Sequence, residues 1–543
     1  MRLLFEYLFG PQLKKETARY LETLAETNVA ASRRQTDTLL KSLKASSDPQ
    51  ITIGCTPWGA PVIVPISEIV GAHGVVTGTT GSGKTRMGLA VIKALLDSII
   101  ESLIAEACNP CGFGALDAKG DLFHGTLFLI AKHLQELQRA HPHAARELRR
   151  RIVIIDFSSR FPGPVMSYNI FARWPGLEAD FFAANRADVL MDLLPGSDRL
   201  SLGASGVLNK LILLMSEHGV PITDLGEIVG NERRRSRLVA QCRDRSLAAY
   251  FTRQFPQVPK STLAALLRRI DGLFTSDGVR LALGGVSAPN FRQLQDEGKI
   301  VVITSFGKTI ARGVRRVLQK LVFSDITQSV FSRQKPESPF PWLCDEAQNF
   351  FHTESLRDNV TDLLTMSRSF GTFFLFFTQD LQTAVHDPRI LRVLNTNTRW
   401  CMTMRGDPAD CTFLKSALPI TGRRFKPRPH PFAEQSLYSP TEERSLVHQE
   451  IASLPDRQGF IWLKNRSAEA IPVVVADVPI PDGNALMKAT STIRQDATIG
   501  GRMSRKQYDQ AIAARDKEQS YEAPDLSMAL TRRYQSTREA RGV

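Results

Sequence analysis

The chain has 543 residues, a net charge of +14 and a hydrophobic fraction of 43%. This length allows two or three domains and excludes a small single-core protein, and the hydrophobic fraction is typical of a globular chain. The basic excess favours a polyanionic partner, either nucleic acid or a membrane surface, over a neutral one. A merely basic soluble protein is the alternative.

Targeting and redox signals point to the cytoplasm. No run reaches about 18 consecutive apolar residues, the length that a membrane span needs. Met1–Phe9 is too short for a signal peptide and contains Glu6. The seven scattered cysteines fit a reducing compartment. Cys108 and Cys111 form a lone C-x-x-C pair, which favours two thiols before a strand over a zinc site. We therefore expect a cytoplasmic protein, with peripheral docking at the inner membrane as the alternative.

The first segment, residues 1–48, is predicted to be a helical arm. Leucines recur at helical spacing between residues 13 and 45, and Ser46–Pro49 breaks the pattern. From Ile51 the texture changes to short strands. Whether the arm packs on the body or contacts a partner is left open.

The strongest motif follows, as a strand, a glycine-rich loop and a helix. His73–Thr77 reads as a buried strand, and the loop matches G-x-x-x-x-G-K-[ST] at every fixed position. Lys84 would reach the β- and γ-phosphates of a nucleotide, and Thr85 would hold Mg²⁺. A glycine-rich turn with a chance lysine is the alternative, which the flanking strand and helix disfavour. The predicted nucleotide-binding residues are Gly78, Thr79, Thr80, Gly81, Ser82, Gly83, Lys84, Thr85 and Arg86.

Strands and helices then alternate, which predicts an α/β fold with a doubly wound, mainly parallel sheet. Strand-like runs at Phe113–Asp117 and Ile152–Asp156 complete a first core part over 49–172. Residues 173–296 lose the strands and are predicted to form an all-α insertion. The core resumes over 297–480. The remaining tail, 481–543, is charged and poor in aromatics, so one helix and some disorder are expected there.

An acidic pair supplies the second half of the predicted site. Phe340–Ala347 reads as an apolar strand that ends in Asp345 and Glu346. A phosphate-loop NTPase needs an Asp at a strand end to orient Mg²⁺ and its water, and Asp345 fits that role. Glu346 would then polarise the attacking water as general base. An ordinary Asp-Glu pair at a strand–loop junction is the alternative.

A third element runs from Arg368 to Gln379, where an apolar strand ends in Thr378 and Gln379. Gln379 could hydrogen-bond the γ-phosphate or the lytic water and report its loss. Arg368 precedes the strand and could enter a neighbouring subunit's site as an arginine finger. A surface salt bridge is the equally weighted alternative for Arg368.

Together these motifs resemble the HerA/FtsK superfamily of DNA-pumping ATPases, and within it the TraG/TraD-type coupling proteins of conjugation and type IV secretion. The resemblance spans about Ile51 to Pro479. It rests on the phosphate loop with its lead-in, the acidic pair, and four further segments. Those segments are Asp117–Asp121, Ser167–Phe171, Arg368–Gln379 and Asn395–Arg399. Ala118 stands where the family usually has proline.

The resemblance implies a RecA-like P-loop NTPase core with an inserted all-α domain, assembled as a homo-hexamer around DNA. It implies ATP and Mg²⁺ as cofactors and hydrolysis at subunit interfaces. Lys84, Glu346, Arg368 and Gln379 would be catalytic, and Thr85 and Asp345 would hold the metal. Lys119 could also reach a neighbouring site. Coupling proteins of membrane complexes usually carry transmembrane helices, which this sequence lacks, so the secretion-pore role is in doubt.

Several functions stay open. The leading hypothesis is an ATP-driven DNA translocase that delivers DNA to a transfer machine, with a membrane-complex or relaxosome-like protein partner. Candidate DNA contacts are Arg233–Arg237 and Arg423–His430, although each could be a solvated surface. The alternatives are a secretion ATPase acting on protein, a DNA motor of mobile-element maintenance or defence, a nucleotide-gated adaptor, and a metabolic phosphotransferase as the weakest.

Overall fold

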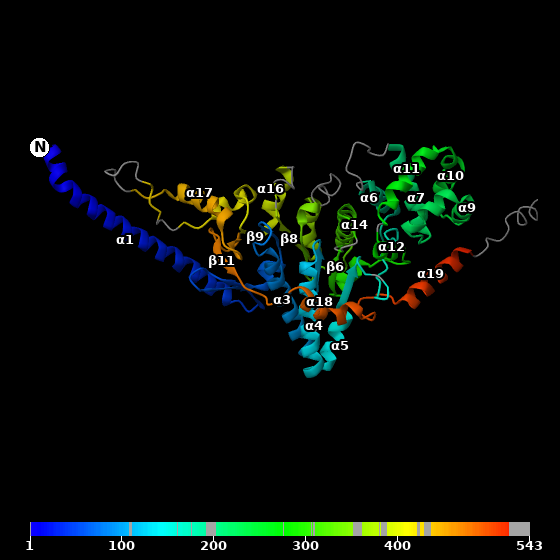
Figure 1. The fold of residues 1–543 in the computed structure, drawn as a ribbon, viewed down its shortest axis with the longest axis horizontal. Coiled ribbons are helices and arrows are strands. Elements are labelled where there is room, and N and C mark those ends of the chain that lie inside the picture. The colour runs from blue at the N-terminus through cyan, green and yellow to red at the C-terminus, as the bar shows by residue number, and fades with distance from the viewer. Residues whose placement is uncertain are drawn as a thin grey trace, which may run out of the picture. The chain divides into compact units, whose positions relative to one another are not determined.

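The fold is described from a computed structural model of the chain (Figure 1). The described residues are 2–107, 111–159, 161–174, 176–191, 202–274, 276–305, 307, 310–350, 361–379, 381, 388–420, 424–427 and 436–520. The chain divides into two compact units. The first comprises Met1–Val153, Phe291–Thr304 and Val322–Ile493, and the second comprises Ile154–Asn290, Ser305–Leu321 and Arg494–Val543.

In the described part of the chain, eleven strands form one sheet in the order β2-β1-β11-β10-β9-β3-β8-β7-β4-β6-β5. The strands are β1 (Gln50–Cys55), β2 (Pro61–Pro65), β3 (His73–Thr77), β4 (Phe113–Asp117), β5 (Ile152–Asp156), β6 (Ile300–Thr304), β7 (Phe340–Cys344), β8 (Thr372–Thr378), β9 (Thr398–Met404), β10 (Gln458–Leu463) and β11 (Ile471–Val475).

The sheet has a parallel part and an antiparallel part. β3 pairs in parallel with both β8 and β9, and β7 pairs in parallel with β8 and β4. β10 pairs antiparallel with β9 and β11, and β1 pairs antiparallel with β11 and β2. In the parallel part the carboxyl ends of β3, β8, β7 and β4 share one edge, where open α/β sheets bind ligands. The predicted α/β class with a mainly parallel core sheet is confirmed.

The central strands are buried along their whole length, which explains their apolar sequences. Every residue of β3, β4, β7 and β8 is buried. Strands covered on both faces read as continuous apolar runs rather than as alternating ones. The sheet therefore gives the polar residues that follow each strand a rigid base.

The helices of the first unit flank this sheet. Helices α3, α4 and α5 pack on one another, and Figure 1 shows them gathered together. The helices lying wholly or mainly in this unit are α1 (Arg2–Lys44), α2 (Ile66–Val70), α3 (Lys84–Ile104), α4 (Asp121–Ala140), α5 (Pro142–Arg151), α13 (Phe291–Asp296), α16 (Pro388–Asn397), α17 (Pro440–Glu450) and α18 (Gly483–Gln495). Helix α14 (Arg312–Val330) begins in the second unit and ends in the first.

The N-terminal arm is a single helix that begins earlier than the predicted pattern at residue 13. Helix α1 spans Arg2–Lys44, and its last turns bury Leu40 and Leu43. Trp58 donates a hydrogen bond to Asp37 over 3.2 Å, so the end of the arm is fastened to the turn between β1 and β2. No helix among the described residues has both the length and the apolar character to span a bilayer.

The second unit consists of helices and turns over its described residues, apart from the end of β5. Helix α7 packs against α6, α10 and α11 around a leucine-rich core that includes Leu211 and Leu214. The helices of this unit are α6 (Ala179–Met191), α7 (Leu202–Glu217), α8 (Leu225–Gly230), α9 (Glu232–Ala240), α10 (Arg245–Arg253), α11 (Lys260–Asp271), α12 (Asp277–Leu283) and α19 (Arg505–Ser520).

The C-terminal segment is more ordered than its composition suggests. Met503 donates its backbone N–H to the carbonyl of Val165 over 2.7 Å. The Tyr508 hydroxyl, on α19, donates to the carbonyl of Leu281 over 3.0 Å. These contacts attach residues 494–520 to the helical unit, and residues 521–543 of the predicted tail lie outside the described residues.

Candidate functional site

The glycine-rich loop after β3 is braced by backbone groups from distant parts of the chain. The N–H of Thr79 donates to the carbonyl of Arg405 over 2.7 Å, just beyond β9. The N–H of Arg457 donates to the carbonyl of Ser82 over 2.8 Å, just before β10. The loop therefore has a fixed shape that its own sequence does not impose.

The loop is closely packed and leaves one buried polar group at the start of α3 without a partner in the described part of the chain. Gly83 has φ of 112°, and a Cβ there would lie 2.8 Å from the Met404 Cε atom and 3.0 Å from the Arg457 Cα atom. Only glycine fits this conformation and this space. The Ser82 hydroxyl is buried and has no hydrogen-bond partner among the described residues. A helix N-terminus with a glycine cradle and an orphaned donor suits a phosphate group.

Lys84 lies folded over the loop. Its Nζ atom donates to the carbonyls of Gly78 over 2.6 Å and Thr79 over 2.9 Å. Burial lowers the pKa of Lys84 to about 8, while the charge of Asp345 opposes that shift. Phosphate oxygens would be better acceptors for this ammonium than two carbonyls, since they carry charge.

Carboxylates gather at the ends of β4 and β7. Asp117 ends β4, is buried, and accepts backbone N–H bonds from Lys119, Gly120 and Phe123. Asp345 follows β7 and is also buried. Burial, together with the charges of Asp117 and Glu346, raises the pKa of Asp345 to about 8. Such a concentration of acidic oxygens beside a phosphate cradle suits a hard divalent cation.

Glu346 adopts an unusual backbone conformation and has three polar partners. Its φ is 53°, in the left-handed region that a non-glycine residue rarely occupies. Its carboxylate is paired with the ammonium of Lys119, and it accepts hydrogen bonds from the amides of Gln348 and Gln379. Backbone strain of this kind collects at functional sites, where surrounding contacts maintain it.

Gln379 connects the loop to Glu346. Its Oε1 atom accepts a hydrogen bond from the Thr80 hydroxyl over 2.9 Å, and its Nε2 atom donates to Glu346 over 2.5 Å. The side chains of Thr80, Gln379, Glu346 and Lys119 thus form one chain of contacts. Any group that binds the loop at Thr80 can change the position of the Glu346 carboxylate through this chain.

Two further predicted loop residues, Thr85 and Arg86, point to different surroundings. Thr85 lies in the first turn of α3, directly after Lys84 and half-buried. Arg86 points to the segment after β11, where it donates to the carbonyl of Val478 over 2.5 Å and lies 3.6 Å from Asp477. Arg86 is therefore engaged away from the loop.

Arg368 does not join this cluster. It lies in the short 3₁₀ helix η4 (Ser367–Phe370), which precedes β8, whereas Gln379 follows β8. Arg368 is exposed, and its guanidinium makes no hydrogen bond or ion pair with the described residues. The two side chains thus lie at opposite ends of one strand.

Sequence reasoning missed Asp117 as a third carboxylate of the site, and it missed Arg405 and Arg457 beside the loop. Arg405 follows β9 and forms an ion pair with Asp456 at 2.7 Å. The signal that could have found it is its position at the carboxyl end of a strand. That signal has no value until β9 is known to pair with β3, which only the structure shows.

The predicted basic run on the second unit is partly used for internal contacts. Arg234 pairs with Asp224 at 2.7 Å and also with Glu227. Arg235 stacks over the ring of Phe255 at 4.8 Å. The exposed arginines of this region are Arg233, Arg237, Arg243 and Arg245.

The second basic segment is similar where it is described. Arg424 forms a two-pronged ion pair with Glu450 over 2.5 and 2.6 Å, and Lys426 pairs with Glu442 at 2.7 Å. Its other cations, Arg423 and Arg428–His430, lie outside the described residues, as do Cys108–Pro110 of the C-x-x-C pair.

No protein-family model matches this sequence, and no curated protein matches it. Solved structures do. VirB4 of Thermoanaerobacter pseudethanolicus is similar with a TM-score of 0.50 and 12% identity, over 80% of this chain and 98% of that chain. The bacterial conjugative coupling protein TrwB, in a form called TrwBdeltaN70, has a TM-score of 0.47 and 16% identity over 82% and 92% of the two chains. The plasmid coupling protein TrwB in complex with ADP and Mg²⁺ has a TM-score of 0.48 and 16% identity, over 82% of this chain and 94% of that chain.

At these identities the likeness speaks to the fold. The match to VirB4 covers nearly the whole of that chain, and the sheet order described above places a phosphate loop and an acidic pair at one edge. The resemblance found from the motifs is confirmed at the level of the fold. The chain has a RecA-like P-loop NTPase fold, which it shares with VirB4.

Proposed function

We propose that the chain binds ATP with Mg²⁺ and hydrolyses it to drive the movement of DNA toward a transfer machine. One observation carries the catalytic part of this proposal. Three segments far apart in the sequence bring Thr80, Lys84, Asp345, Glu346 and Gln379 to a single edge of the sheet. A phosphate cradle, a buried acid and a strained glutamate in one place have the parts that phosphoryl transfer to water requires.

The residues divide the work as follows. Lys84 would leave the carbonyls of Gly78 and Thr79 to contact the β- and γ-phosphates. The Thr85 hydroxyl and the Asp345 carboxylate would hold Mg²⁺, which supplies neutralisation of charge on the phosphates. Glu346 would accept the proton of the attacking water, and Gln379 would orient that water.

Gln379 also gives the site a means of detecting nucleotide. In the structure it bonds both Thr80 on the loop and Glu346. A γ-phosphate near Thr80 would compete for these groups and release Glu346 toward water. Loss of that phosphate would restore the contacts, so the state of the nucleotide would be reported to β8.

The DNA part of the proposal is supported by charge. The chain carries a net charge of +14, and the helical unit exposes Arg233, Arg237, Arg243 and Arg245. Exposed guanidinium groups on a helical surface fit sequence-independent contacts with phosphates. A homo-hexamer with the neighbour's Arg368 in each site completes the proposal, because Arg368 lies at the wrong end of β8 to serve its own loop.

A secretion ATPase that acts on protein is the second candidate. It is favoured by the internal pairing of Arg234, Arg235, Arg424 and Lys426, which removes about half of the predicted DNA-binding cations. The two candidates differ in what stimulates hydrolysis. Both need the same catalytic edge.

The experiment is steady-state ATP hydrolysis with and without single- and double-stranded DNA over a series of salt concentrations. Lys84→Ala and Glu346→Gln test whether the nucleotide site performs the hydrolysis. A combined Arg233→Ala/Arg237→Ala variant tests the DNA surface. Arg424→Ala, which removes a cation already paired with Glu450, is its control. We expect DNA to stimulate hydrolysis and salt to weaken that stimulation. The double variant should show less stimulation, and Arg424→Ala should show as much as the unaltered chain. A robust rate that ignores DNA would contradict the translocase and favour the protein substrate.

A further inference from the structure

Arg368 is located where its own active site is out of reach. It precedes β8, a strand of 7 residues, and the catalytic edge lies beyond the other end of that strand. At the rise of an extended chain this strand spans about 20 Å. An arginine side chain cannot cover that distance, so any role for Arg368 in hydrolysis requires a second copy of the chain.

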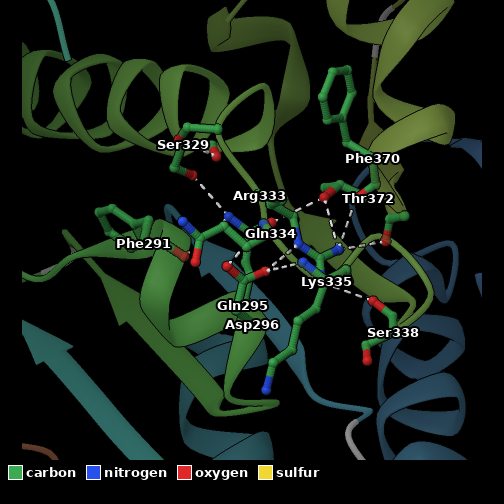
Figure 2. A network of polar contacts seen from close by, with 12 residues as sticks. Phe291, Gln295, Asp296, Ser329, Arg333, Gln334, Lys335, Ser338, Phe370 and Thr372 are labelled. Carbon is green, nitrogen blue, oxygen red and sulfur yellow. Dashed lines mark hydrogen bonds and ion pairs between the residues drawn. The ribbon is translucent and has the colours of Figure 1, made fainter. Parts of the chain in front are cut away.

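The turn that carries Arg368 is held at its end by a buried arginine (Figure 2). The Nη1 atom of Arg333 donates to the carbonyls of Phe370 over 3.0 Å and Gly371 over 2.8 Å. Gly371 has φ of +65°, and a Cβ there would lie 2.0 Å from the carbonyl oxygen of Pro336. The chain thus passes through one tightly determined turn between Arg368 and β8.

Each side-chain nitrogen of Arg333 has a hydrogen-bond acceptor. Its side chain has an exposed fraction of 0%, its Nε atom lies 3.2 Å from Asp296, and its Nη2 atom donates to the carbonyls of Lys335 and Ser338. Asp296 also accepts the backbone N–H groups of Gln334 and Lys335, as Figure 2 shows. A buried ion pair is costly to form and rigid once every donor is satisfied, which suits fixing a geometry better than adding stability.

A second buried group holds the start of the turn. The Nδ1 atom of His73 accepts the N–H of Phe374 over 3.0 Å, so the proton of the neutral ring lies on Nε2. That nitrogen lies 3.2 Å from the Ser367 hydroxyl, which leaves it as the donor of this bond. Burial, together with the charge of Arg368, lowers the pKa of His73 to about 3, so the ring is neutral at pH 7.

Apolar side chains are exposed around Arg368. Met366 is 45% exposed and Phe331 is 38% exposed. The ring of Phe331 meets that of Phe370 edge-on at 5.6 Å, which places it against the same turn. Exposed large apolar groups beside a cation that has no partner among the described residues are typical of a surface that another protein covers.

We propose that Arg333 and His73 are positioning residues that fix the turn Ser367–Gly371, so that Arg368 enters the nucleotide site of a second copy of this chain. The inference rests on the proposed function and adds the device that aims the arginine. An arginine finger acts only when its guanidinium is held close to the transferred phosphoryl group, and a misplacement of about 1 Å can cost about 100-fold in rate.

The experiment is a subunit-mixing assay of ATP hydrolysis. Arg333→Lys keeps a cation beside Asp296 but cannot make the paired bonds to Phe370 and Gly371. Ser367→Ala removes only the bond to His73 and gives a second, milder variant that folds if Arg333→Lys does not. Each variant is mixed with Glu346→Gln subunits, which have no general base but keep an intact turn. Arg186→Lys, at another buried arginine, in the second unit, is the matched control.

We expect a loss of kcat of about 10- to 100-fold for Arg333→Lys and a smaller loss for Ser367→Ala, with KM unchanged. Mixing with Glu346→Gln should restore activity in both cases, because an intact turn then faces an intact base. Arg186→Lys should gain nothing from mixing. A loss that mixing does not restore, or an equal restoration in the Arg186→Lys control, would overturn the proposal.

Arg368→Ala separates this proposal from the function on which it rests. If Arg368→Ala lowers kcat and mixing restores it, while Arg333→Lys and Ser367→Ala leave kcat unchanged, the trans arginine stands and the positioning role is wrong. If Arg368→Ala leaves kcat unchanged, the trans arginine itself is wrong. Absence of any hydrolysis by the unaltered chain would count against the proposed function instead.

Discussion

At one end of β8, Arg333 has an acceptor for each of its nitrogen atoms, whereas at the other end Ser82 has a buried hydroxyl with no partner among the described residues. The first end is complete as it stands, with a fully buried guanidinium and bonded carbonyls. The second end has a strained Glu346, a lysine folded onto its own loop and crowded carboxylates. The contrast shows which end is built to hold its shape and which is built to accept a ligand.

The largest expected effect breaks the ligand-accepting end. Glu346→Gln should lower kcat about 1,000-fold, since a general base contributes about 10² to 10⁴. Nucleotide binding should remain, because Lys84 and the loop are unchanged. Single-turnover hydrolysis and a fluorescent-nucleotide titration check the two halves. Loss of binding together with hydrolysis would show that Glu346 has a structural role.

The next effect breaks the shape-holding end. Gly371→Ala forces a side chain into a left-handed turn and against the Pro336 carbonyl at 2.0 Å, so we expect a loss of about 3 kcal/mol in the free energy of unfolding. Gly59→Ala is the matched control. Its φ is +88° but nothing lies within 4 Å of the added Cβ, so only backbone strain of about 1 kcal/mol applies. Chemical denaturation measures both, and equal losses would show that the close contact is relieved without cost.

A third prediction concerns the ion pair between Lys119 and Glu346 at the ligand-accepting end. Lys119 pairs with Glu346 of its own chain, and its side chain is 40% exposed. Lys119→Met should lower kcat about tenfold because the Glu346 carboxylate loses the ammonium that positions it, in line with the modest strength of a partly exposed ion pair. Because the contact is within one chain, mixing with Glu346→Gln subunits should not restore activity. Restoration would assign Lys119 to a neighbouring site, the role considered from the sequence.

The smallest effect tests the histidine at the shape-holding end by pH. The folded pKa of His73 is about 3, below the ordinary 6.5, so the folded state binds fewer protons than the unfolded state between these values. The stability that the neutral ring contributes is therefore complete above pH 6.5 and is lost as pH falls toward 3. His73→Asn should flatten the slope of unfolding free energy against pH between 6.5 and 4. Urea denaturation at several pH values measures this slope, and an unchanged slope would contradict the assignment.

The strands that lead to the ligand-accepting end could be predicted from the sequence because their signals are local. A phosphate loop must have glycines and a lysine at fixed spacing, and buried parallel strands must be apolar throughout. The runs that end at Thr77, Asp117, Cys344 and Thr378 therefore read as strands in the sequence, and each is a strand in the structure.

The shape-holding end was not predictable in the same way. Ser332–Lys335 reads as an ordinary polar turn, and its residue pattern does not indicate that Arg333 is buried. Its burial depends on Asp296 and Gly371, which lie far from it in the chain. The same limit applies to Arg86, whose partners Asp477 and Val478 come from the segment after β11. Local sequence patterns identify helices and strands. Contacts between distant segments can be assigned only once the order of the strands in the sheet is known.

The bracing of the phosphate loop has a consequence for how the chain is made. The carbonyl that receives the Thr79 N–H belongs to Arg405, and the N–H that meets the Ser82 carbonyl belongs to Arg457. A ribosome synthesises both long after it has completed the loop. Contacts between segments so far apart form late and slowly in folding. The nascent protein should therefore be unable to bind a nucleotide at this loop until almost its entire sheet has emerged.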